Sequence, residues 1–266
     1  MAETNRYVRI IEKLFHSHYQ KGAGEISFER QELERVAQEL DVKLPKNLGD
    51  LIYSFKFRTE LPASIQALAP KGKSWVIRQA GRGKYCFVAV VSTPIVPNER
   101  LAETKIPDAT PGIIEMYALN DEQALLAKLR YNRLLDIFTG ITCYSLQNHL
   151  RTTVPKIGQV ETDELYVGLD QNGVQYILPV QAKGGRDKLN VVQIEQDVML
   201  CSAKFPRLVC RPIAAQFMRD DRIALFEFSA GATDRIVAER HYRLVAPDQV
   251  SADDLAEYQR QTARPL

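Results

Sequence analysis

Cysteine is scarce in this chain, and long apolar runs are missing from it. The four cysteines, Cys86, Cys143, Cys201 and Cys210, are widely spaced and stand in apolar surroundings. They form no C-x-x-C pair, and no histidine stands at metal-ligand spacing from them, which argues against a zinc site and favours reduced core thiols. No apolar segment is long enough to span a bilayer, and the N-terminal segment lacks the uninterrupted apolar run of a signal peptide. We therefore expect a soluble, cytoplasmic protein with no membrane partner.

A strong overall charge is also absent, because the formal net charge is only +2. The total charge alone does not indicate a nucleic-acid partner, but its distribution is uneven. Nine basic and two acidic residues fall between Lys43 and Lys84, a local excess of seven positive charges. Such a basic stretch is typical of a surface that meets phosphate groups, although exposed lysines are also often simply solvated.

The length of 266 residues and the hydrophobic content of 45% favour two domains, each with its own core. A proline-rich segment of low periodicity lies between them and contains Pro94, Pro97, Pro107 and Pro111. We predict a first domain over 1–100, a linker over 101–115 and a second domain over 116–266.

The first domain is predicted to contain three helices and a hairpin. Apolar spacing predicts helices over 5–19, from Ser27 as a cap to Leu40, and after Pro45. Two β-rich runs, 75–78 and 85–90, follow and are joined by a turn rich in glycine and basic residues.

This order resembles the winged-helix family of DNA-binding domains. The resemblance implies that the third helix enters the major groove of double-stranded DNA and that the hairpin tip meets phosphate or the minor groove. The candidate DNA-binding residues are Lys46, Asn47, Lys56, Arg58, Arg82 and Lys84.

The second domain is predicted to follow the order α, β, β, α, β, β. A helix runs from a cap at Asn120 to a break at Gly140, and a second helical piece is expected over 141–151. Strands over 164–169 and 174–183 come next. They are followed by a helix over 190–205 and strands over 207–217 and 222–230. The predicted fold is α/β (α+β), with a mixed central sheet flanked by helices.

The hairpin around "DQNG" decides whether polar side chains gather on one face. Facing residues of an antiparallel pair have a constant index sum. A two-residue turn at Asn172-Gly173 places Asp163 opposite Ala182 and separates it from Gln181 and Lys183. A three-residue loop, 171–173, gives a sum of 344, so Asp163 faces Gln181, with Lys183 one diagonal step away.

These residues resemble the PD-(D/E)XK nuclease superfamily, which includes most type II restriction endonucleases. Its motif is an acid on one strand and (D/E)-x-K on the next, and Asp163 and "QAK" (Gln181, Ala182, Lys183) match it. Gln181 departs from the motif, which has Asp or Glu at that position. The resemblance implies a restriction-endonuclease-like core of order α-β-β-β-α-β behind a small winged-helix-like domain. The alternative is an ordinary strand with an exposed lysine.

The resemblance implies a Mg²⁺ site, because a hard cation takes oxygen ligands and neutralises charge during phosphodiester hydrolysis. The implied ligands are the Asp163 carboxylate, the Gln181 amide oxygen and the Ala182 carbonyl, with Glu161 as the nearest further acid. Gln147 or His149 could stand where some relatives carry a helical Glu. Lys183 would orient or deprotonate the attacking water.

We therefore expect a Mg²⁺-dependent DNA endonuclease, of type II restriction type and acting as a homodimer. Two alternatives stay open. One is a nuclease-fold DNA-binding protein that no longer cleaves, for which the neutral Gln181 is the reason. The other is a repair or recombination nuclease that recognises DNA structure.

Overall fold

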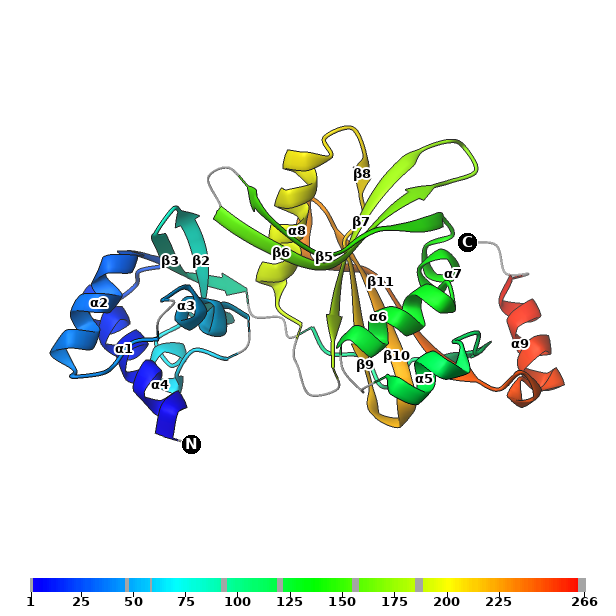
Figure 1. Cartoon of the computed structure of the whole chain (residues 1–266), viewed down its shortest axis with the longest axis horizontal. Helices are drawn as coiled ribbons and strands as arrows, with labels where there is room; N and C mark the ends of the chain where they lie inside the picture. The colour runs from blue at the N-terminus through cyan, green and yellow to red at the C-terminus, as the bar shows by residue number, and fades with distance from the viewer. Residues whose placement is uncertain are drawn as a thin grey trace. The chain divides into compact units, whose positions relative to one another are not determined.

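The computed structural model describes residues 2–45, 48–57, 59–91, 95–118, 122–154, 158–184 and 189–262. Within these residues the protein is a mixed α/β fold with a three-stranded antiparallel sheet and an eight-stranded mixed sheet (Figure 1). The chain divides into two compact units, 1–94 with 151–160, and 95–150 with 161–266. In the described part of the chain no helix combines the length and apolarity needed to cross a membrane.

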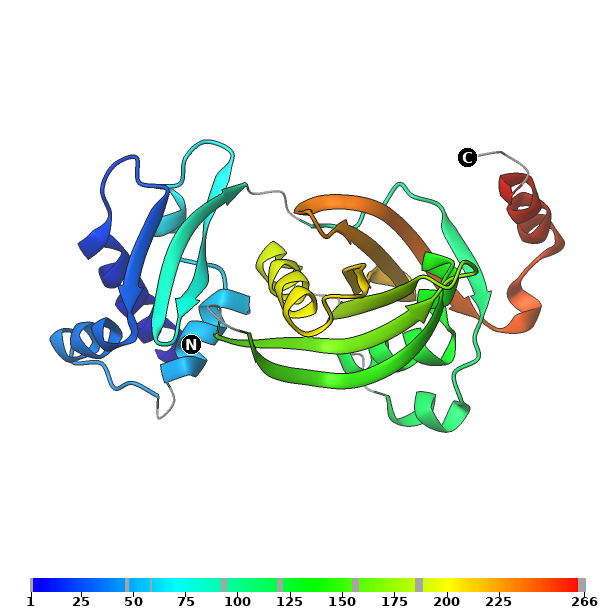
Figure 2. The same ribbon diagram turned by 90° about the horizontal axis from the view of Figure 1, so that it is seen from above.

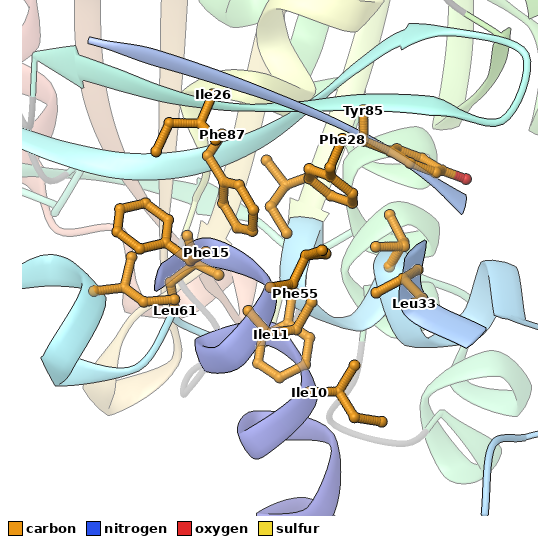
Figure 3. Packing of buried hydrophobic residues seen from close by; sticks show 14 of the residues in the cluster. Ile10, Ile11, Phe15, Ile26, Phe28, Leu33, Phe55, Leu61, Tyr85 and Phe87 are labelled. Atoms are coloured by element: carbon orange, nitrogen blue, oxygen red, sulfur yellow. The ribbon is translucent and has the colours of Figure 1, made fainter. Parts of the chain in front are cut away.

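The first unit packs four helices against a small sheet. Its elements are α1 (Ala2–His18), β1 (Glu25–Glu29), α2 (Arg30–Glu39), α3 (Leu48–Phe57), α4 (Ala63–Gln66), β2 (Lys73–Gly81) and β3 (Lys84–Val91). The strand order is β1-β3-β2. Figure 3 shows Phe15 of α1 directed at the sheet, where its ring centroid lies 5.1 Å from that of Phe87. The predicted first helix is confirmed, and its apolar spacing buries one helix face against the hairpin.

The start of the second helix was predicted wrongly at Ser27. The segment around it is strand β1, in which Ile26 and Phe28 are buried and their neighbours are exposed. This alternation of two β-forming residues has the period of a strand. The helix begins three residues later, where the Glu32 side chain accepts a hydrogen bond of 2.8 Å from the Glu29 N–H.

The second unit is built on the large sheet. Its strands are β4 (Glu103–Pro107), β5 (Thr142–Val154), β6 (Gly158–Leu169), β7 (Gln175–Lys183), β8 (Val209–Cys210), β9 (Ile213–Phe217), β10 (Arg222–Ser229) and β11 (Ala232–Val245). Its helices are α5 (Gly112–Tyr117), α6 (Glu122–Tyr131), α7 (Leu134–Thr139), α8 (Val191–Lys204) and α9 (Ala252–Thr262), with 3₁₀ turns at Arg219–Asp221 and Pro247–Gln249. The strand order is β4-β11-β10-β9-β7-β6-β5, and β8 pairs with β7.

A helix was predicted over 141–151, and this prediction is wrong. The segment forms most of strand β5 instead. The single helix predicted from Asn120 to Gly140 is divided into α6 and α7, because Arg133 between them adopts a left-handed φ of 50°. Asn120 lies outside the described residues. The predicted end at Gly140 is confirmed, since this residue follows α7 in the left-handed region at φ 68°. The following sequence contains Thr142, Tyr144 and, at its end, Thr152 and Val154, which favour a strand. Because short apolar runs fit both helical and extended periods, spacing alone did not separate the two.

Segment 101–115, the predicted linker, contains β4 and the beginning of α5. Strand β4 adds to the large sheet in parallel with β11. Arg243 fixes it there through two hydrogen bonds to the Glu103 carboxylate, of 2.8 and 2.9 Å. Pro107 is tolerated because it is the last residue of an edge strand, where a missing N–H costs little.

Helices cover both faces of the large sheet (Figure 2). On one face Leu125 and Leu129 of α6 pack with Val180 and Ala182 of β7. On the other face Ile194 of α8 packs against residues of β9 and β10 such as Ala214 and Phe226. The end of β7 therefore lies where side chains from α6 and from α8 can both reach it.

Candidate active site

The hairpin has the register that gathers the candidate residues. Pairs from Glu164 with Val180 to Leu169 with Gln175 all have residue numbers that sum to 344. Gly173 occupies the left-handed region at φ 80°, and its N–H donates to the Asp170 carbonyl over 3.1 Å. A left-handed glycine of this kind belongs to the three-residue loop. The prediction of that loop is confirmed, and a two-residue turn is excluded.

Asp163 lies one position beyond the last ladder pair, on the side of the hairpin where β7 ends. Its Oδ2 atom accepts a hydrogen bond of 2.8 Å from the Ala182 N–H. Burial raises the pKa of Asp163, an effect that the nearby Lys183 ammonium and the Ala182 N–H partly offset. A main-chain hydrogen bond thus holds the Asp163 carboxylate against strand β7, close to the positive charge of Lys183.

Lys183 is buried at the end of β7, with only 7% of its surface exposed. Its Nζ atom lies 2.8 Å from Oε1 of Glu122, in the first turn of α6. Glu122 also acts on Asp163, because the repulsion between the two carboxylates raises the pKa of Asp163. Sequence reasoning missed Glu122, although an acid in the first turn of a predicted helix was a visible signal.

Gln181 is fixed by helix α8. Its Nε2 atom donates to Oδ2 of Asp197 over 2.9 Å, and its Oε1 atom accepts from Nε2 of Gln193 over 3.2 Å. Both partners lie on α8, four residues apart. The amide at the motif position is therefore oriented by two side chains of one helix.

Asp197 is almost fully buried, at 1% exposure. Burial raises its pKa well above the ordinary value, and the nearby Asp163 carboxylate adds to this effect, while hydrogen bonds from Gln181 and Thr162 oppose it. An ionised carboxyl group that is buried in this way lowers the stability of the folded protein unless hydrogen bonds and a positive charge compensate for its lost hydration. Asp197 is thus an acid outside the motif whose side chain is hydrogen-bonded to Gln181.

The other candidate residues are placed less favourably. Glu161 contacts His149, with 3.4 Å between Oε1 and Nδ1, and His149 adopts a left-handed φ of 50° in β5. Gln147 is exposed on the same strand. Neither Gln147 nor His149 stands on a helix, and the carboxylates that helices place near the motif are Glu122 of α6 and Asp197 of α8. Ala182 is fully buried, and its N–H is used by Asp163.

The donor set suits a hard cation in its chemistry. Asp163, Glu122 and Asp197 offer carboxylate oxygens, and Gln181 offers an amide oxygen. Among the residues that the structure describes, no group of three or more His, Cys, Asp or Glu side chains forms a ready metal cluster. Mg²⁺ does not require three protein ligands of these kinds, because it is usually held by one or two carboxylates together with substrate phosphates and water. The residues present therefore fit this ion.

The candidate DNA-binding residues fall into three groups. Lys46, Asn47 and Arg58 lie outside the described residues. Lys56 was predicted to contact DNA, but it is buried, at 5% exposure, and burial lowers its pKa to about 8. Its ammonium group is therefore not on the surface, where it could meet a phosphate. Arg82 and Lys84 are exposed at the turn between β2 and β3.

Comparison of the sequence with models of known protein families and with curated proteins gives no match.

Proposed function

We propose that this protein is a metal-dependent phosphodiesterase acting on double-stranded DNA. More specifically, we propose a Mg²⁺-dependent endonuclease of the PD-(D/E)XK type, with sequence-specific cleavage as in type II restriction enzymes. The observation that carries the proposal is the buried Lys183, held next to Asp163 on a hairpin of the required register. A buried lysine with two carboxylates near it is typical of a site built for chemistry.

The order of elements supports the same proposal. When the short helix α7 and the two-residue strand β8 are set aside, the elements from α6 to β9 follow the α-β-β-β-α-β order that the resemblance implies. Strands β7 and β9 are parallel neighbours, with α8 between them in sequence. The two motif positions thus fall on the second and third strands of that core, as the family pattern requires.

Each residue would have a distinct role. When bound, Mg²⁺ supplies a positive charge for the phosphate and a water of lowered pKa. Asp163 would hold the ion, with Glu122 and the Gln181 amide as further oxygen donors. The Lys183 ammonium would orient the attacking water and stabilise negative charge on the phosphate, and its burial strengthens both interactions.

The first unit would supply DNA binding. Its three long helices and antiparallel hairpin contain the elements that the winged-helix resemblance needs, and the exposed Arg82 and Lys84 stand at the hairpin tip. Cutting both strands of a duplex commonly uses two active sites, so we propose a homodimer. The neutral Gln181 favours one second candidate, a DNA-binding protein of the same fold that does not cleave.

Cleavage of supercoiled plasmid DNA tests the proposal directly. We expect nicked or linear product with Mg²⁺ and unmethylated plasmid, none with EDTA, and a loss of at least about 100-fold for Asp163→Ala, because a ligand to the ion is removed. Glu115→Ala, an exposed acid on α5, serves as the control. Discrete fragments indicate sequence-specific restriction, and cutting confined to branched DNA indicates a repair nuclease. Metal-independent binding of DNA without any cleavage favours the inactive alternative.

The hairpin tip gives a second prediction, for binding alone. The logarithm of the DNA-binding constant falls linearly with the logarithm of the salt concentration. Each phosphate contact that is lost makes this negative slope shallower by about one unit. We expect Arg82→Ala and Lys84→Ala each to produce that change in fluorescence anisotropy titrations with duplex DNA. Lys105→Ala, which removes a lysine paired with Asp254, should leave the slope unchanged. An equal slope for the two tip variants and wild type contradicts DNA contact by the tip.

A further inference from the structure

Asp197 presents a problem of charge. It is almost fully buried, and no Lys, Arg or His side chain in the described residues forms an ion pair with it. Its hydrogen bonds come from uncharged groups, the Gln181 amide and Thr162. Burying an ionised carboxylate without a cation costs several kcal/mol, so such a group takes up a proton unless a positive charge or a metal ion lies against it.

Gln181 presents the opposite problem. It stands on β7 at the position where the motif has an acid, and an amide adds no negative charge to a cation site. Its Nε2 atom is 2.9 Å from the Asp197 carboxylate, so the missing charge lies one hydrogen bond away, on α8. Asp163 and Lys183 are both close enough to act on Asp197 electrostatically. The four groups therefore share one electrostatic environment.

We infer that Asp197 supplies the second negative charge of the cation site, in place of the strand acid that Gln181 lacks. This inference rests on the proposed function, because it assumes a divalent cation at Asp163. Asp197 acts either as a ligand or through the Gln181 amide that it orients, and in both cases its charge strengthens cation binding. A purely structural Asp197 would hold α8 to β7 and have no effect on cation affinity.

The test uses the full chain and the ions alone, without DNA. We expect isothermal titration with Mn²⁺ and Mg²⁺ to show a 10- to 100-fold loss of affinity for Asp197→Asn, the size usual for residues that support metal ligands. The double variant Gln181→Glu with Asp197→Asn moves the acid back to the strand and should recover affinity to within a few-fold of wild type. Glu195→Gln removes one charge from the same helix and should change affinity by less than threefold.

The outcomes separate this inference from the proposed function. If wild type binds no divalent cation, or binds it equally well after Asp163→Ala, the proposed site itself is wrong. If wild type binds and Asp163→Ala does not, but Asp197→Asn binds like wild type, only the role of Asp197 is wrong. Circular dichroism checks the fold of each variant. Should Asp197→Asn not fold, the double variant decides. If Asp197 supplies the charge, moving the acid from α8 to β7 should leave the Mn²⁺-induced rise in Tm as in wild type. A larger rise than in wild type means that Asp197 contributed no charge, and it overturns the inference.

Discussion

Replacing Lys183 by methionine should lower the rate of DNA cleavage by about 10²- to 10⁴-fold, the usual contribution of a positioned proton-transfer group. The loss should appear in kcat with little change in KM, since the ammonium group acts mainly on charge that develops in the transition state. Methionine fills most of the buried space that Lys183 occupies, so the fold should persist. Glu122, the partner of Lys183, keeps a side chain that is 37% exposed and can turn to water.

Steady-state cleavage of a labelled duplex, with Tm measured in parallel, checks this prediction. Lys105→Met is the matched control, because Lys105 also stands on a strand of the large sheet and pairs with an acid at 2.9 Å, but on the edge strand β4. Cleavage by the Lys183 variant within threefold of wild type would rule out a catalytic lysine. An equal loss for both variants would point to a general effect of removing positive charge.

The parts of the site that lie close in sequence were predictable. The loop before β7 contains Gly173, and a three-residue loop with a left-handed glycine at that point gives the observed register. The three-residue loop therefore predicted that Asp163 and Gln181 face each other on the two strands of the hairpin. The same local rules located α1, β2 and β3, in which apolar residues repeat at one clear period.

The residues that complete the site could not be derived in this way. Glu122 meets Lys183 across 61 positions of the chain, and Asp197 meets Gln181 across 16. Both contacts depend on how helices pack on the two faces of a sheet whose edge strand, β5, was predicted to be a helix. The neutral Gln181 was still a useful signal, because a missing charge at a motif position invites a search for an acid elsewhere.

The buried ion pair between Arg130 of α6 and Glu164 of β6 should contribute strongly to the free energy of unfolding. Glu164 follows Asp163 in β6 and is fully buried, and Arg130 of α6 donates to its Oε1 atom from Nε at 3.1 Å and from Nη2 at 2.9 Å. Burial lowers the pKa of Arg130, but the bond and attraction to Glu164 outweigh this and raise it. Arg130→Met leaves the buried carboxylate without its cation, so we expect the free energy of unfolding to fall by about 3–5 kcal/mol in urea titrations.

A double-mutant cycle identifies the cause of that loss. If the cost comes from an uncompensated buried charge, removing the charge as well should restore most of the stability, so Arg130→Met with Glu164→Leu should unfold close to wild type. Arg133→Met is the control, because the Arg133 side chain is 59% exposed in its pair with Asp136, and such pairs contribute about 1 kcal/mol or less. A double variant that is no more stable than Arg130→Met would mean that Arg130 stabilises the unit through packing rather than charge. In the expected case the pair fixes β6, the strand that carries Asp163, against α6.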